Sequence, residues 1–154
     1  MSTVEEKLLA MGLELPEAPA PVAAYVPCVR TGNLLFVSGQ VPRVKGELRF
    51  RGHVGVELGV DDGIEAAQMC ALNALAVVKS EIGDLSRIRR VVKVTGYVAS
   101  GVGFHQQPKV VDGASLLLAE LFGEKGKHAR SAIGVNELPL GVSVEVELIL
   151  EIEP

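Results

Sequence analysis

The C-terminal stretch from Val142 to Ile152 alternates apolar residues with mainly polar ones. Valine, leucine and isoleucine occupy every second position, and Ser143, Glu145 and Glu147 lie between them. Successive side chains of a β-strand point to opposite faces of the sheet, so this pattern predicts a strand with one buried and one largely polar face. A sheet built from such strands needs a covering layer on one side only.

Two helical patterns supply that layer. The segment "DDGIEAAQMCALNALAVVKSEIG" places apolar residues along one helical stripe and ends at Gly83. A second helix is predicted over about residues 107–121, ending at Gly123. Strands are predicted over 24–29, 33–38 and 89–99, with two more after His128. The order ββαβαββ predicts an α+β fold: a mixed sheet with two helices packed on one face.

Residues 1–20 are predicted to form an N-terminal helix and a proline-rich connector that lead into the main domain, residues 21–154. Ser2 or Thr3 precedes Glu5 or Glu6 by three residues, which is the spacing of a capping box and predicts a short helix. The proline-rich segment that follows predicts an extended connector.

Composition argues against several classes of function. The 154 residues carry a net charge of −4, so nucleic acid is not the expected partner. Two cysteines and three histidines are scattered without a ligand motif, so no metal site is predicted. No apolar run reaches the roughly 18 residues of a membrane span, and the default location is the cytoplasm.

The last two strands are predicted to form a hairpin around Pro139 and Leu140. Antiparallel pairing then sets Arg130 opposite Ile149 and places Ile133 and Val135 on the core face. Arg130, Ala132, Gly134 and Glu145 fall on the other face, where the two small residues leave space beside the guanidinium.

Arg130 has two interpretations on that face. Its planar fork can hold a carboxylate by two parallel hydrogen bonds, or it can pair with an acidic neighbour at the surface. Glu145 lies roughly 13 Å away in this register, at 3.3 Å per residue, too far to share a small ligand within one chain. Either the two residues serve a site between subunits, or Glu145 is a solvated glutamate. The uncovered apolar sheet face predicts self-association independently.

The segments "YVPCVRTGNLLFVSGQVP" and "ARSAIGVNELPLGVSVEVE" resemble the YjgF/RidA family, also labelled L-PSP endoribonucleases. The resemblance spans residues 22–152 in order, and the extra N-terminal helix is similar to a longer-chain branch. It implies a chorismate-mutase-like fold, a homotrimer and ligand sites between subunits. It also implies hydrolysis of 2-imino or 2-enamino acids to 2-keto acids and ammonia, without a metal or cofactor.

The resemblance assigns roles to individual residues. Arg130 holds the substrate carboxylate with help from the Ala132 N–H, and Glu145 positions the attacking water. Tyr25 closes the pocket, and Ser38 and Gly39 border the ligand. Two positions depart from the family pattern: Ala132 replaces a common cysteine, and Asp112 aligns with an asparagine that contacts ligand. A carboxylate at Asp112 would repel a bound carboxylate unless it is protonated or turned away.

Two other functions stay open. The first is a non-catalytic trimer that binds small carboxylates as a regulator. The second is the endoribonuclease of the family label, against which stand the negative charge and the absence of a paired-histidine or histidine-lysine arrangement.

Overall fold

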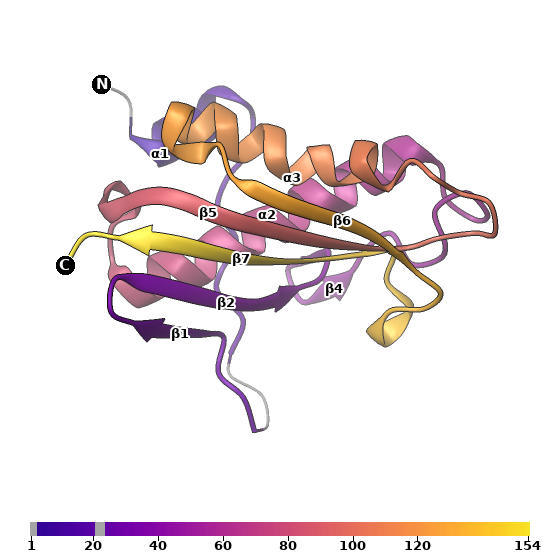
Figure 1. Cartoon of the computed structure of the whole chain (residues 1–154), viewed down its shortest axis with the longest axis horizontal. Coiled ribbons are helices and arrows are strands. Elements are labelled where there is room, and N and C mark those ends of the chain that lie inside the picture. The colour runs from indigo at the N-terminus through magenta and orange to yellow at the C-terminus, as the bar shows by residue number, and fades with distance from the viewer. Residues whose placement is uncertain (1–2, 21–23) are drawn as a thin grey trace.

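The computed structural model describes residues 3–20 and 24–154 (Figure 1). Helix α1 (Val4–Ala10) begins at Thr3, whose side chain and that of Glu6 form the predicted capping box. Ser2, the alternative cap, lies outside the described residues. The side chain of Leu8 is almost fully buried, and Lys7 Nζ donates to the carbonyl of Leu121 at 3.1 Å. These contacts attach the N-terminal helix to the main domain.

Five strands form one sheet in the order β1-β2-β7-β5-β6. They are β1 (Cys28–Thr31), β2 (Leu34–Gln40), β5 (Ile88–Ala99), β6 (Ala129–Val135) and β7 (Val144–Ile152). Strands β3 (Arg43–Val44) and β4 (Glu47–Leu48) form a separate hairpin. The predicted strands all exist, although β1 begins at Cys28, later than expected.

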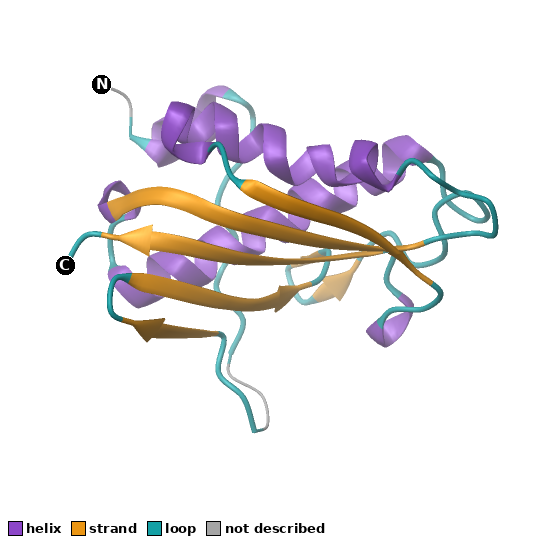
Figure 2. Cartoon of the chain, in the orientation of Figure 1, coloured by secondary structure: helices purple, strands orange, loops and turns teal. Residues whose placement is uncertain are grey.

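Helices α2 (Val60–Ile82) and α3 (Gln107–Phe122) lie on one face of the sheet, as predicted (Figure 2). The two helices approach closely at Gly113, where an added Cβ would come 2.0 Å from the Ile64 carbonyl oxygen. Only glycine permits this approach. Short 3₁₀ helices occur at η1 (Leu85–Arg87), η2 (Gly123–Gly126) and η3 (Pro139–Gly141). Among the described residues, no helix is long and apolar enough to cross a membrane.

The predicted hairpin between the last two strands is wrong. Strand β5 lies between β6 and β7; it runs parallel to β6 and antiparallel to β7. Helix α3 makes the connection from β5 to β6, as a parallel pair requires, and β7 enters the sheet between β2 and β5. Alternation revealed the strands but contained no information about which strand would pair with which.

The corrected pairing also changes the faces of β6. Ile133 pairs with Tyr97 and is 44% exposed on the uncovered face, so its assignment to the core is wrong. Val135, also assigned to the core, is only partly buried. Arg130 pairs with the buried Val94, which places it on the helix-covered face. The space expected beside Gly134 is occupied, since an added Cβ would come 2.6 Å from Gln107 Nε2.

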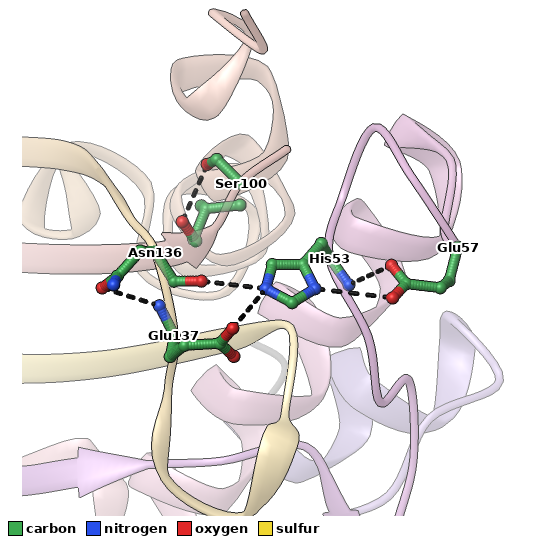
Figure 3. A network of polar contacts seen from close by, with 6 residues as sticks. His53, Glu57, Ser100, Asn136 and Glu137 are labelled. Atoms are coloured by element: carbon green, nitrogen blue, oxygen red, sulfur yellow. Dashed lines mark hydrogen bonds and ion pairs between the residues drawn. The ribbon is translucent and has the colours of Figure 1, made fainter. Parts of the chain in front are cut away.

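A polar contact holds the segment that connects β6 to β7 (Figure 3). His53 Nε2 lies 2.8 Å from the Asn136 carbonyl oxygen and 3.1 Å from Glu137 Oε1. Glu57 flanks the other side of the ring, with Oε1 at 3.5 Å from Nδ1. The glycine-rich segment before α2 is thereby tied to the connection between the two strands that carry Arg130 and Glu145.

Candidate functional site

Glu145 lies in β7 opposite Tyr97, on the face that the helices leave uncovered. Its carboxylate lies against the backbone of Gly39, where an added Cβ would come 2.7 Å from Glu145 Oε1. Gly39 lies within a β-bulge, because the pairing of β2 with β7 shifts between Val37 and Gln40. The bulge and the missing side chain together make room for the carboxylate.

A cavity of about 1380 Å³ is lined by Glu145, Gly39, Ser38 and Tyr25. Residues 13–20 of the connector also line it, so the N-terminal extension forms part of the wall. On α2, Asn73 Nδ2 donates to the carbonyls of Val41 and Arg43, both at 3.0 Å. These bonds hold the segment that follows β2 at the rim of the cavity.

Ser38 fixes the segment that carries Tyr25. Its hydroxyl donates to the Val26 carbonyl at 2.7 Å, and its N–H donates to the Pro27 carbonyl at 2.8 Å. The hydroxyl proton of Ser38 is therefore used within the protein. Tyr25 is 64% exposed at the cavity, so its hydroxyl is accessible to a ligand.

Burial raises the pKa of the Glu145 carboxyl above its usual value, and the charge of Glu147 adds to the rise. Tyr97 donates its hydroxyl to Glu147 Oε1 at 2.7 Å, and this bond raises the pKa of Tyr97 to about 12. A carboxylate with a raised pKa is a stronger base, so Glu145 is better suited than an ordinary carboxylate to accept a proton.

Arg130 lies in β6 beside helix α3, in a groove of about 290 Å³. Its Nη1 donates to Asp112 Oδ1 at 2.7 Å and to Ser115 Oγ at 3.2 Å. Asp112 is thus the acidic neighbour that the second interpretation of Arg130 required. The carboxylate of Asp112 is turned toward the guanidinium, which answers the concern about repulsion of a ligand.

Within one chain the predicted site residues fall into two groups. Tyr25, Ser38, Gly39 and Glu145 line the cavity, whereas Arg130 lines the groove and bonds to Asp112. Ala132, two positions from Arg130, packs against the core. Across the sheet, paired residues form rows perpendicular to the strands. One row contains Arg130, Val94 and Leu148, and another contains Tyr97 and Glu145. These rows are three apart, about 10 Å at 3.3 Å per residue, and the two side chains lie on opposite faces.

Sequence reasoning missed Ser115 and His128. Ser115 Oγ lies 2.8 Å from His128 Nε2, and His128 Nδ1 lies 2.6 Å from the Gly126 carbonyl oxygen. Ser115 belongs to α3, whereas His128 directly precedes β6. No spacing in the sequence indicates their contact, which depends on how α3 packs beside the edge strand.

A family model described as "YjgF/chorismate_mutase-like, putative endoribonuclease" matches residues 5–152. The chain therefore belongs to the YjgF/RidA family, as its residues indicated. Protein TCP17 of Trypanosoma cruzi is 41% identical over 150 residues, which cover 97% of this chain and 94% of that protein. The fold expected for the family, an α+β arrangement of the chorismate-mutase-like type, is thus present.

Two further relatives bear on structure and activity. The protein Atu1372 of Agrobacterium tumefaciens, whose crystal structure was described as having unknown function, has a TM-score of 0.93 at 46% identity. The match covers 97% of this chain and 92% of that one. A Dermatophagoides farinae protein named 2-iminobutanoate/2-iminopropanoate deaminase is 31% identical over 142 residues, 92% of this chain and 95% of its own.

Proposed function

We propose that the protein is a cofactor-independent hydrolase that converts small 2-imino or 2-enamino acids to 2-keto acids and ammonia. The observation that carries the proposal is the half-buried Glu145, whose raised pKa and position over Gly39 suit a base in a large cavity. The relative named as an imine deaminase supports this substrate class.

Glu145 accepts a proton from a water molecule while the water oxygen bonds to the imine carbon. Glu145 passes this proton to the imine nitrogen, which gives a carbinolamine. Glu145 then takes the proton of the carbinolamine hydroxyl and delivers it to the nitrogen as the carbon–nitrogen bond breaks, so that the C=O bond forms and ammonia leaves. The products are one 2-keto acid and one ammonia for each imine and water. Arg130 contributes by binding the substrate carboxylate, which orients the imine carbon.

The site is formed between two subunits of a homotrimer. In one chain Arg130 and Glu145 lie on opposite sheet faces, so one small ligand cannot contact both. The uncovered face also carries Val29 and Phe36, which are 53% and 40% exposed. Apolar groups gathered on one sheet face favour contact with a second copy of the chain.

The direct test uses an amino-acid oxidase to generate 2-iminobutanoate and measures whether the protein accelerates 2-oxobutanoate release. Arg130→Ala and Glu145→Gln should each remove the acceleration, whereas Arg89→Ala should retain it because Arg89 is exposed on β5. Absence of acceleration with several imino acids would contradict the proposal. Calorimetric binding of 2-oxobutanoate without any turnover would instead support the carboxylate-binding regulator.

A further inference from the structure

The guanidinium of Arg130 is held from one side only. Both hydrogens of Nη1 have partners on helix α3, Asp112 Oδ1 at 2.7 Å and Ser115 Oγ at 3.2 Å. Across residues 3–20 and 24–154, neither Nε nor Nη2 makes a hydrogen bond or ion pair with the protein. Because the five N–H groups of arginine lie in one plane, fixing Nη1 also fixes the direction of the Nε–Nη2 edge.

Ser115 can accept from Arg130 because His128 takes its proton. The Gly126 carbonyl can only accept, so the neutral ring of His128 carries its hydrogen on Nδ1, 2.6 Å from that oxygen. His128 Nε2 then accepts from the Ser115 hydroxyl at 2.8 Å. The Ser115 lone pairs are thereby directed toward Arg130. The chain of bonds runs from Arg130 through Ser115 and His128 to Gly126.

We propose that Ser115 and His128, together with Asp112, are positioning residues that hold Arg130 with its Nε–Nη2 edge directed at a ligand carboxylate. This rests on the proposed function only in that the ligand is a carboxylate. The Nε–Nη2 edge offers two parallel N–H groups, the geometry that holds both oxygens of a carboxylate. Arg130 lines the groove with a side chain that is 23% exposed, so part of it is accessible while the rest stays constrained.

The assignment explains the acidic residue beside an anion site. Asp112 takes one Nη1 hydrogen of Arg130 and leaves the opposite edge to the ligand. Its own side chain is 46% exposed, so its charge is partly screened by water. Asp112 therefore acts through Arg130 rather than on the ligand.

A positioning role predicts a specific kinetic pattern. Loss of one support leaves Arg130 in the site but less fixed, which weakens carboxylate binding in the ground state and the transition state alike, so KM rises and kcat stays nearly unchanged. Ser115→Ala should weaken 2-oxobutanoate binding and raise KM for the imine by about threefold to tenfold, the range for one hydrogen bond. Ser115→Thr restores the hydroxyl and should recover affinity to within about twofold of wild type.

The experiment measures 2-oxobutanoate binding by calorimetry for wild type, Ser115→Ala, Ser115→Thr, His128→Ala and the control Ser80→Ala. Ser80 is an exposed serine of α2 and should bind as wild type when replaced. Nuclear magnetic resonance of the Arg130 side chain without ligand is the second measurement. Slow rotation about the Cζ–Nη1 bond in wild type, and faster rotation in Ser115→Ala and His128→Ala, is expected.

Several results would overturn the inference. They are wild-type affinity in folded Ser115→Ala, failure of Ser115→Thr to recover binding, freely rotating Nη1 in wild type, or no binding of 2-oxobutanoate by wild type. A fall in kcat at unchanged KM would also contradict it. If the affinities follow the expected order but no imine is hydrolysed, the deaminase proposal fails and the positioning inference stands.

Discussion

Glu145 and Arg130 lie in surroundings that differ in a way suited to different tasks. Arg130 has two partners on α3 that fix its guanidinium. Glu145 has no hydrogen bond or ion pair within the described chain, and burial disfavours its charge. A fixed cation suits the binding of an anion, whereas an unpaired carboxylate with a raised pKa suits proton transfer. The comparison suggests that Arg130 binds the ligand and that Glu145 transfers the proton.

The largest expected effect comes from removing the base. Glu145→Gln should lower kcat for 2-iminobutanoate by about 10² to 10⁴, the usual contribution of a general base, with 2-oxobutanoate affinity nearly unchanged. Steady-state kinetics and calorimetry measure the two quantities. Glu147→Gln is the control, because Glu147 lies on the same face of β7 but bonds to Tyr97. An equal kcat loss in this control would remove the special role of Glu145.

Glu145→Gln should stabilise the protein although it lowers kcat. Because folding raises the pKa of Glu145, the folded state binds more protons than the unfolded state at pH values between the two pKa values. The protein therefore loses stability as pH rises through that range. Glu145→Gln removes this cost and should raise the thermal midpoint at pH 7. A midpoint below that of wild type, measured by calorimetry over pH 4 to 7, would contradict the explanation based on burial.

The next effect tests whether the two regions meet between subunits. Arg130→Ala and Glu145→Gln chains, each inactive, are unfolded, mixed in equal amounts and refolded. If each site takes Arg130 from one subunit and Glu145 from its neighbour, about one quarter of the sites regain both wild-type residues. About one quarter of wild-type activity is therefore expected. Activity no higher than that of the separate variants would contradict a site shared between neighbouring subunits.

A smaller effect is expected from crowding Glu145. Gly39→Ala places a Cβ 2.7 Å from Glu145 Oε1, so the carboxylate must move while the backbone stays in place. We expect kcat to fall about tenfold through this misplacement, with little change in thermal midpoint. Gly134→Ala is a matched control, since its Cβ would meet the flexible Gln107 at 2.6 Å. Equal kcat losses in both variants would contradict a specific effect on Glu145.

The same contrast separates what the sequence could predict from what it could not. Local patterns predicted α2, α3 and the strands, because periodicity records which face of each element is buried. They could not predict that β5 lies between β6 and β7, which reversed the face of Arg130. The family resemblance assigned Gly39 and Glu145 to a ligand site but did not predict their direct approach. The contacts of Ser115 with Arg130 and His128 depend on tertiary packing alone.

The smallest effect concerns His53, which holds the segment connecting Arg130's strand to Glu145's strand (Figure 3). The hydrogen bond to the Asn136 carbonyl, followed by the charge of Glu137 and the hydrogen bond to Glu57, raises the pKa of His53. This contribution to stability is complete below the unfolded-state pKa of about 6.5 and is lost as pH rises through the higher folded-state pKa.

Wild type should therefore lose thermal stability relative to His53→Gln as pH rises from 6 to 8. The difference should be on the order of 1 °C, because the ion pairs lie at the surface. The sign of the midpoint change distinguishes the two replacements: His53→Gln should lower the midpoint, most at acidic pH, whereas Glu145→Gln should raise it, most at neutral pH. If the thermal midpoints of wild type and His53→Gln change with pH in parallel, the segment before α2 and the segment between β6 and β7 stay together without the imidazolium.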